Sequence, residues 1–255
     1  MFVAERQEQI LKQLEEHEKV KVKELSQMFD VTEDCIRKDL ASLEERGLLK
    51  RAYGGAVKIK PVIHESKVAK RRNQNLKEKQ NIAKKAVKLI SNRDVVFLDI
   101  STTNIEIAKE ILGSGKKVTV VTNMLDIANV FANVADTKVN FILIGGTFNR
   151  GQDGFLGGMT LESINKFNFD IGFMGVVGAN ITKDSVTTYA MEDGICKEKI
   201  IQASKKVYLV METMKFDLDA NYKFTSFTAV DGVICEKNPG KEVKEKLEGF
   251  GTKLY

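Results

Sequence analysis

The chain has 255 residues, of which 43% are hydrophobic and 29% charged, and its 40 lysines and arginines against 35 aspartates and glutamates give a net charge of +5. Two prolines and no tryptophan argue against a disordered or collagen-like chain. This length allows a small domain joined to a medium one. No apolar run approaches the roughly 20 residues of a membrane helix, and the charged N-terminus is unlike a signal peptide. We therefore expect a cytoplasmic protein that does not engage a membrane.

Cysteine and histidine content argues against a metal or redox centre. Cys35, Cys196 and Cys235 are widely separated in the sequence and form no CxxC pair, so neither a disulfide framework nor a zinc site is expected. The two histidines, His17 and His64, are interpreted as solvated surface or linker residues. The sequence therefore predicts no metal and no cofactor.

Positive charge is concentrated in one segment. Residues 61–88 hold nine lysines and arginines against two acidic residues, whereas residues 1–60 hold twelve of each. A concentrated basic segment can contact a nucleic-acid backbone. It can equally be a solvated helical linker, and both interpretations remain open.

Apolar residues at helical spacing predict three helices within residues 4–43. Thr32 is a suitable N-cap for the third of them. The second and third have the spacing of a helix-turn-helix, in which the N-terminal part of the later helix enters the major groove of DNA. The apolar positions are Ile10, Leu11, Leu14, Val22, Leu25, Phe29, Ile36, Leu40 and Leu43.

A small hairpin, or wing, is predicted after Gly47, where two β-prone stretches flank a glycine pair at 54–55. Arg37 is the candidate for bidentate contact with guanine, and Lys50 is a candidate for phosphate contact. Glu33 and Asp34 would repel phosphate, and a three-helix bundle for protein contacts is the alternative. The candidate DNA-binding residues are Thr32, Cys35, Arg37, Lys38, Lys50, Arg51 and Tyr53.

These residues resemble the N-terminal signature of DeoR-type bacterial transcriptional regulators. The matching positions are Val31-Thr32, residues 36–40 (Ile-Arg-Lys-Asp-Leu), Leu43, Gly47 and residues 51–56 (Arg-Ala-Tyr-Gly-Gly-Ala). Cys35, Lys38 and Tyr53 stand where the family more often has threonine, a second arginine and histidine. The resemblance implies DNA binding, and the three departures bear on the operator sequence.

Strands and helices are predicted to alternate after residue 81. Apolar runs predict strands at 95–98, 118–121, 141–144, 171–177, 207–210 and 233–235, with helices between and after them. Such alternation predicts an α/β fold with a mostly parallel sheet covered by helices on both faces. The expected organisation is a winged helix-turn-helix domain at 1–57, a basic linker at 58–75, and an α/β effector-binding and oligomerisation domain at 76–255.

Polar residues and glycines follow three of these strands. Residues 99–104 (Asp-Ile-Ser-Thr-Thr-Asn), 122–123 (Thr-Asn) and 145–147 (Gly-Gly-Thr) come directly after strand positions. A helix that opens at Ser101 offers free backbone N–H groups to an anion such as phosphate, although serine and threonine also cap helices routinely. Arg150 and Lys183 are further phosphate candidates, or solvated loop charges.

This part of the chain is similar to the effector domain of the same family, which implies a ribose-5-phosphate-isomerase-like fold and a phosphorylated sugar as ligand. The family pattern Asp, any residue, Gly, Ser/Thr, Thr matches residues 99–103 with Ser101 in place of glycine. Residues 170–178, Glu192 with Lys197, and residues 212–216 also have family equivalents; Lys215 is retained, while Glu212 and Met214 depart from the pattern. The candidate effector-binding residues are Asp99, Ser101, Thr102, Thr103, Thr122, Asn123, Gly145, Gly146, Arg150, Glu192 and Lys215.

We therefore expect a DNA-binding transcriptional regulator, a repressor of a sugar-utilisation operon, whose affinity for double-stranded operator DNA is set by a phosphorylated sugar. Paired half-sites imply a homodimer or homotetramer. The first alternative is a phosphosugar isomerase that uses Asp99 or Glu192 as general base and Lys215 for charge stabilisation. The second is a C-terminal domain that only oligomerises. Because no acid/base pair is recognisable from spacing, no catalytic residue is assigned.

Overall fold

A computed structural model describes residues 3–17, 19–46, 48–57, 68–132, 134–135 and 137–255. Contacts divide the chain into two compact units, Met1–Val62 and Ile63–Tyr255, and each is described by itself. Most of the predicted linker, residues 58–67, lies outside the described residues, as does His64. The predicted limits of 1–57, 58–75 and 76–255 stay predictions.

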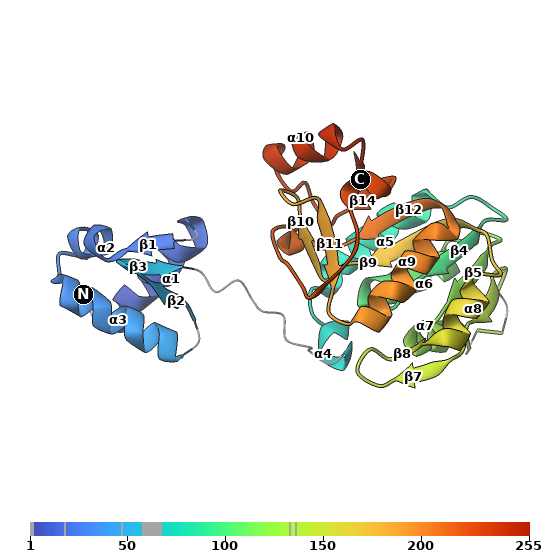
Figure 1. The fold of residues 1–255 in the computed structure, drawn as a ribbon, viewed down its shortest axis with the longest axis horizontal. Coiled ribbons are helices and arrows are strands. Elements are labelled where there is room, and N and C mark those ends of the chain that lie inside the picture. The colour runs from blue at the N-terminus through green and yellow to red at the C-terminus, as the bar shows by residue number, and fades with distance from the viewer. Residues whose placement is uncertain (1–2, 18, 47, 58–67, 133, 136) are drawn as a thin grey trace. The chain divides into compact units, whose positions relative to one another are not determined.

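The described residues of the N-terminal unit form three helices and a three-stranded antiparallel sheet, whose arrangement is drawn in Figure 1. The helices are α1 (Val3–His17), α2 (Val22–Phe29) and α3 (Glu33–Glu45), and the sheet has the order β1 (Lys19–Lys21), β3 (Gly55–Val57), β2 (Lys50–Ala52). The three helices and the hairpin confirm the prediction. Strand β1 escaped it because, of its three residues, only Val20 is buried. The core is Ile10, Leu14, Val20, Val22, Leu25, Ile36, Leu40, Leu43, Leu49 and Ala56.

Gly55 permits a close approach between β1 and the wing. A Cβ atom at this position would lie 2.0 Å from the Val20 carbonyl oxygen. We expect Gly55→Ala to lower the free energy of unfolding of the N-terminal unit by about 1–3 kcal/mol, the usual cost of overpacking. Chemical denaturation measures the change. The control is Gly113→Ala, where a Cβ meets nothing within 4 Å; equal effects of the two changes would contradict the prediction.

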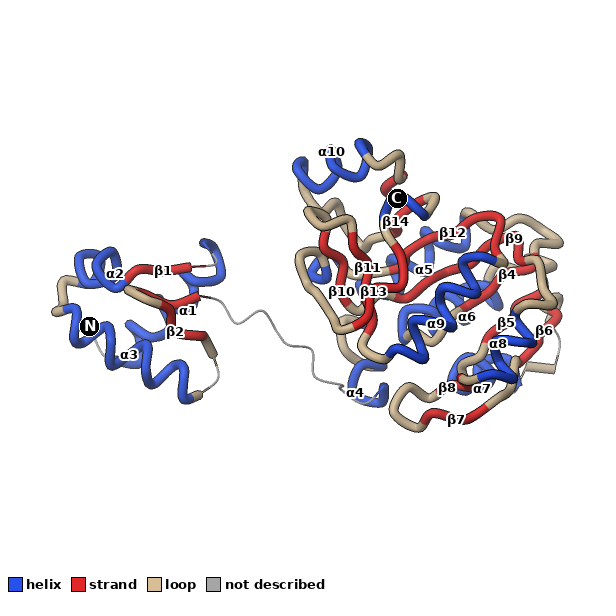
Figure 2. Tube along the Cα trace, in the orientation of Figure 1, coloured by secondary structure: helices blue, strands red, loops and turns tan. Residues whose placement is uncertain are grey.

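A seven-stranded parallel sheet forms the centre of the C-terminal unit (Figure 2). Its order is β15 (Lys253–Leu254), β14 (Gly232–Ile234), β12 (Ser204–Val210), β9 (Phe169–Gly175), β4 (Val95–Leu98), β5 (Thr119–Thr122), β6 (Asn140–Leu143). Every neighbouring pair is parallel. The predicted α/β fold with a mostly parallel sheet is confirmed.

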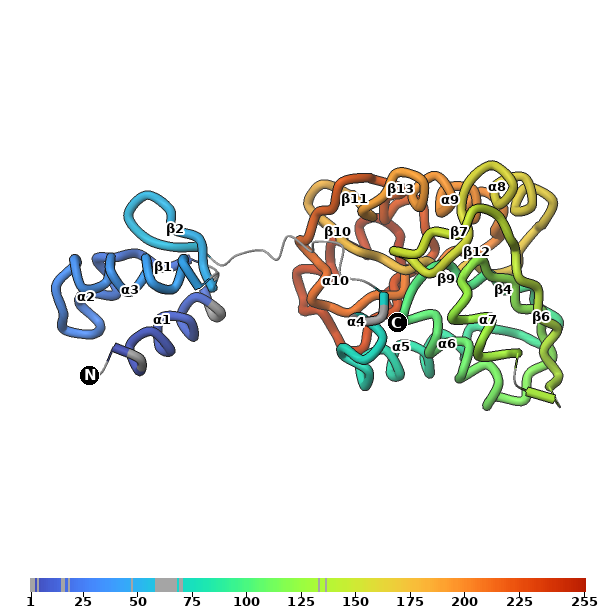
Figure 3. Tube along the Cα trace, turned by 90° about the horizontal axis from the view of Figure 1, so that it is seen from below, coloured from blue at the N-terminus to red at the C-terminus, as the bar shows by residue number. Residues whose placement is uncertain are grey.

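Apolar side chains leave the sheet on both faces, because successive residues of a strand point to opposite sides. Val96 and Leu98 pack in one core with α5 (Leu76–Lys88), α6 (Thr102–Gly113) and α7 (Leu125–Ala132). Phe97 packs in the other with α8 (Gly158–Ile164), α9 (Met191–Gln202) and α10 (Lys241–Gly249). The two helical layers are seen edge-on in Figure 3.

Several short elements were not predicted from the sequence. A second sheet, entirely antiparallel, has the order β10 (Gly178–Asn180), β11 (Ser185–Thr188), β13 (Tyr222–Thr225), and β7 (Thr147–Asn149) forms a hairpin with β8 (Gly154–Leu156). Helix α4 (Val68–Arg72) and the 3₁₀ turns η1 (Thr213–Lys215) and η2 (Phe227–Ala229) were also missed. Runs of three to five residues are too short for a periodic pattern. Among the described residues, no helix is both long and apolar enough to cross a bilayer.

Candidate functional site

Helix α3 presents its polar face at its N-terminal end. Thr32 caps the helix, as predicted, by accepting a hydrogen bond from the Cys35 backbone N–H at 3.3 Å. The Arg37 guanidinium donates to Glu33 Oε2 at 2.6 Å and to Asp34 Oδ1 at 2.7 Å. The acidic residues thus balance the charge of Arg37 instead of standing alone at the helix terminus. Lys38 is exposed, and its side chain makes no hydrogen bond or ion pair within the described residues.

The wing carries the other candidate DNA-binding residues at the surface. Lys50, Arg51 and Tyr53 are exposed, and Tyr53, at the tip, is more accessible than in an extended reference peptide, at 110%. The Arg51 backbone N–H donates to Glu44 Oε1 at 2.8 Å, which ties the wing to α3. Helix α3 and the wing therefore both present cationic side chains at the surface.

A buried ion pair fixes α3 against α1. Arg6 Nε lies 2.5 Å from Asp39 Oδ2, and their side chains are 9% and 4% exposed. The hydrogen bond to Asp39 raises the pKa of Arg6 above its ordinary value, against the effect of burial. This pair was not predictable from the sequence, because the two residues are 33 positions apart and no local pattern joins them.

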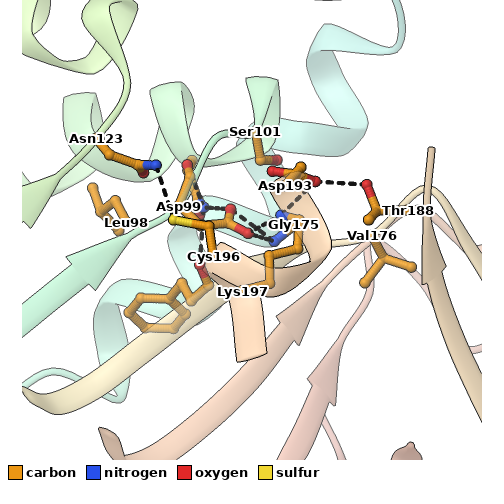
Figure 4. A network of polar contacts seen from close by, with 12 residues as sticks. Leu98, Asp99, Ser101, Asn123, Gly175, Val176, Thr188, Asp193, Cys196 and Lys197 are labelled. Atoms are coloured by element: carbon orange, nitrogen blue, oxygen red, sulfur yellow. Dashed lines mark hydrogen bonds and ion pairs between the residues drawn. The ribbon is translucent and has the colours of Figure 1, made fainter. Parts of the chain in front are cut away.

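The candidate ligand edge lies where the strand order of the parallel sheet reverses. Strand β4 stands between β5 and β9, from which the chain proceeds outward in opposite directions. In open parallel sheets, ligands bind beyond the carboxyl ends of the strands at such a point. Asp99 follows β4 directly. Its carboxylate accepts hydrogen bonds from the Gly175 N–H, at 2.9 and 3.0 Å, and from Asn104 Nδ2, at 2.6 Å (Figure 4).

Lys197 of α9 is the buried cation of this edge. Its ammonium group pairs with Asp99 and lies 3.8 Å from Asp193, whose Oδ2 accepts from the Thr188 hydroxyl at 2.6 Å. Burial acts to lower the pKa of Lys197, but the two carboxylates raise it above its ordinary value. Burial raises the pKa of Asp99, against the lowering by Lys197. Lys197 has an equivalent in the family that the sequence resembles, but it was not among the candidate effector-binding residues. Its burial could have been predicted from its position three residues before the apolar Ile200, on the same face of the helix.

The turns after β4 and β5 bring the predicted polar residues to this edge. Ser101 caps α6 by accepting from the Thr103 N–H at 3.2 Å, so its capping role is real, and Thr102 and Thr103 are buried. Thr122 Oγ1 donates to the Leu98 carbonyl oxygen at 2.6 Å. Asn123 Nδ2 donates to the Phe155 carbonyl oxygen at 2.9 Å, while its buried Oδ1 has no partner within the described residues.

The remaining candidates have different surroundings. Gly146, at φ 152°, lets α8 approach, since a Cβ there would lie 2.0 Å from Thr160 Oγ1, and Thr160 donates to the Gly145 carbonyl at 2.9 Å. Arg150 and Glu192 are exposed, and neither side chain forms a hydrogen bond or ion pair in the described part of the chain. Lys183, by contrast, pairs with Asp219 at 2.8 Å.

Lys215 lies beside the end of β9. Its ammonium group donates to the Val176 carbonyl oxygen at 2.7 Å and lies 3.1 Å from Glu212. Burial acts to raise the pKa of Glu212, but Lys215 and Lys79 together hold it below its ordinary value. Glu212 is therefore an ionised partner that keeps Lys215 at the edge of the sheet.

Two family models match the chain. A DeoR-like helix-turn-helix domain covers residues 6–62, and a DeoR C terminal sensor domain covers residues 74–237. The chain belongs to the DeoR family of transcriptional regulators. Because the family consists of regulators, the predicted regulator is confirmed over the isomerase alternative.

Relatives match this DeoR-family regulator over nearly its whole length. The uncharacterized HTH-type transcriptional regulator FruR of Bacillus subtilis is 31% identical and aligns over 90% of this chain and 88% of its own. The glycerol-3-phosphate regulon repressor of Escherichia coli is 30% identical over 92% and 91%. A ribose 5-phosphate isomerase A structure from Methanocaldococcus jannaschii is similar at TM-score 0.41 and 14% identity over 56% and 55%. At that score the likeness carries no argument.

The charged groups at the carboxyl edge of the sheet in the sensor unit, Ile63–Tyr255, disfavour an anion at one point and favour it at another. Asp99 and Asp193 place two carboxylates around the ammonium group of Lys197, and this excess of negative charge disfavours a phosphate at that point. The capped N-terminus of α6 and Lys215 are the groups that favour an anion.

Proposed function

We propose that this regulator binds double-stranded operator DNA through the N-terminal part of α3 and the wing, and represses a sugar-utilisation operon until a phosphorylated sugar binds its sensor unit. The observation that carries the proposal is that Arg37, Lys38, Lys50, Arg51 and Tyr53 are exposed on a helix and hairpin of the winged helix-turn-helix arrangement. The name of one relative, a glycerol-3-phosphate regulon repressor, supports a phosphorylated metabolite as the signal. Thr32, the N-cap of α3, and Cys35, in its first turn, are proposed to contact the DNA at the same end of the helix.

The sugar phosphate is proposed to bind at the carboxyl edge of the parallel sheet. The N-terminus of α6, at residues 101–103, and Lys215 favour its phosphate. Asn123 Oδ1, which has no partner within the described residues, is the acceptor for a sugar hydroxyl group, while Asp99 and Thr122 hold the turns around it through their own hydrogen bonds. The glycine pair at 145–146, Arg150 and Glu192 border the same edge as candidate contacts. The binding must favour one arrangement of the regulator over the other, since equal affinity for both would shift nothing.

The regulator is proposed to act in the cytoplasm as a homodimer or homotetramer. Helix-turn-helix proteins commonly bind paired half-sites as dimers, so one α3 from each of two copies would occupy the two half-sites. The segment of residues 58–75 is proposed to connect the DNA-binding domain, residues 1–57, to the sensor and oligomerisation domain, residues 76–255.

Selection of duplexes from a random library by the full chain tests the DNA-binding part. We expect enrichment of a site with two related halves. Fructose 1-phosphate, glucose 6-phosphate and glycerol 3-phosphate are then each titrated into the complex of the regulator with the selected duplex, and one of the three compounds is expected to weaken DNA binding. Failure to enrich any sequence would refute the operator proposal; enrichment without response to any phosphorylated sugar would refute the effector proposal alone.

Arg37 and Lys50 are expected to play different parts on the operator. Arg37→Ala should weaken binding to the selected duplex by about 1–3 kcal/mol and relax base preference, because it removes a bidentate base contact. Lys50→Ala should weaken binding to all duplexes alike and flatten the dependence on salt, because it removes a phosphate contact. Fluorescence anisotropy on selected and scrambled duplexes at several salt concentrations measures both effects. Equal, sequence-independent losses would contradict the division of roles.

A further inference from the structure

Helix α4 is fastened to the ligand edge by one arginine. The Arg72 guanidinium bonds to the Asp126 carboxylate, 54 residues away, and lies 3.3 Å from Asp153 Oδ2, 81 residues away. Asp126 stands in the first turn of α7, and Asp153 in the turn between β7 and β8. These contacts, named here the Arg72 bridge, join three segments that are remote in sequence.

The two turns that carry the carboxylates also hold each other through the backbone. The Leu125 N–H donates to the Asp153 carbonyl oxygen at 3.0 Å, and the Phe155 N–H donates to the Asn123 carbonyl oxygen at 2.7 Å. Asn123 Nδ2 returns a hydrogen bond to the Phe155 carbonyl at 2.9 Å. Asn123, at the ligand edge, is therefore hydrogen-bonded directly to the strand that follows Asp153.

Arg72 allows the two carboxylates to lie close together. The side chains of Asp126 and Asp153 are 9% and 19% exposed, and Asp126 Oδ2 is buried without a hydrogen-bond partner within the described residues. Burial and the neighbouring Asp153 raise the pKa of Asp126 to about 6. Two like charges held in partly buried turns repel each other unless a cation lies between them. Arg72, at 45% exposed, is that cation.

Chain connectivity gives the bridge its regulatory meaning. Arg72 ends α4, and the chain that precedes α4 leads through residues 58–67 to the wing strand β3. Val68, at the start of α4, is buried in the sensor core beside α5 and α6 residues. Helix α4, within the proposed connecting segment of residues 58–75, is thus the described part of the Ile63–Tyr255 unit that is nearest in sequence to the DNA-binding unit.

We propose that Arg72 is a positioning residue whose bridge to Asp126 and Asp153 couples occupancy of the ligand edge to helix α4, and through α4 to the DNA-binding unit. The coupling to DNA rests on the proposed function. A ligand at this edge can affect α4 through the Arg72 bridge only if it binds with different affinity to the protein with the bridge formed and to the protein with the bridge broken.

The first test compares operator affinity with and without the sugar phosphate that releases the wild-type protein. Coupled sites typically change each other's affinity about 5- to 150-fold. In Arg72→Ala this ratio should fall to within about twofold of one, while operator affinity without ligand and ligand affinity without DNA stay near their wild-type values. Lys77→Ala, which removes an exposed charge from the first turn of α5, is the matched control and should keep the wild-type ratio. Undiminished release of Arg72→Ala from the operator overturns the proposal and leaves the proposed function standing.

The second test needs neither ligand nor DNA. Asn123→Ala disturbs the ligand edge, and hydrogen exchange of the residue 68–75 amides reports on α4. We expect Asn123→Ala to speed this exchange several-fold in the wild-type background and to leave it unchanged in the Arg72→Ala background. Equal effects in both backgrounds, or none in either, refute the bridge. If exchange is coupled but no sugar phosphate releases the operator, the effector proposal fails and the bridge stands.

Discussion

Lys197→Met is expected to lower the free energy of unfolding of the sensor unit by about 3–5 kcal/mol, the usual consequence of removing one partner of a buried ion pair. The Lys197 side chain is 3% exposed, and its removal leaves the Asp99 and Asp193 carboxylates buried without a compensating cation. Methionine fills much of the lysine volume, so lost packing contributes little. Urea denaturation at neutral pH measures the change.

The loss should be largest in alkaline solution. Burial already raises the pKa of Asp99, and without Lys197 the folded-state pKa rises further above the unfolded value. An acid whose pKa is raised by folding destabilises the folded state when it is ionised, and this penalty is relieved as the pH falls through the folded-state pKa. The deficit of Lys197→Met should therefore shrink as the pH is lowered toward the ordinary pKa of an aspartate.

Two further variants separate charge from packing. Lys199→Met, on the same helix, removes a lysine whose side chain bonds to Gln202 at 3.2 Å, and should change stability by less than about 0.5 kcal/mol. Adding Asp99→Asn to Lys197→Met should restore part of the lost stability, because it removes one of the unpaired charges. A deficit that is independent of pH, or is not reduced by Asp99→Asn, would show that packing rather than charge is responsible.

Periodic patterns in the sequence were sufficient for the main elements. The apolar run at 95–98 corresponds to β4, because both faces of this central strand are buried. The spacing of Ile36, Leu40 and Leu43 corresponds to α3, because one face of that helix is buried over several turns. The antiparallel sheet of β10, β11 and β13 was missed, since its strands are three or four residues long and β13 joins β11 from a distant part of the chain. A three-residue strand such as β1 carries no period.

Local sequence predicted which residues stand at the ligand edge but not how their charges are balanced. Asp99, Ser101 and Asn123 follow their strands, and adjacent parallel strands end at one edge, so their gathering was predictable. Lys197 and Gly175 reach Asp99 from elements 98 and 76 residues away. Such partners are set by the tertiary packing of α9 and β9 on β4. The same holds for Arg72, whose interpretation as part of a basic connecting segment could not include its two carboxylate partners.

Arg6→Met is expected to lower the free energy of unfolding of the DNA-binding unit without removing any of its candidate DNA-binding side chains. Asp39, which is 3% exposed in the wild-type protein, would keep Gln7 Nε2, at 3.4 Å, as its remaining side-chain partner among the described residues. Loss of a hydrogen bond between charged groups costs about 1.5–3 kcal/mol. A unit of about 60 residues buries little surface and is marginally stable, so this loss unfolds a sizeable fraction of it.

The predicted consequence is confined to one unit. Amides of α3 (Glu33–Glu45) should exchange with solvent faster in Arg6→Met by the factor that the lost stability implies, while amides of β4 (Val95–Leu98) keep their wild-type rates. Because only the folded unit binds the operator, operator affinity should fall with the folded fraction, and so by the full factor only when most of the unit is unfolded. The affinity should recover on cooling toward the temperature of maximum stability. Arg46→Met is the control, because Arg46 is exposed and bonds to Gln7 Oε1 at 3.0 Å on the surface. If Arg46→Met speeds α3 exchange as much as Arg6→Met does, the buried pair is not what holds α3 against α1.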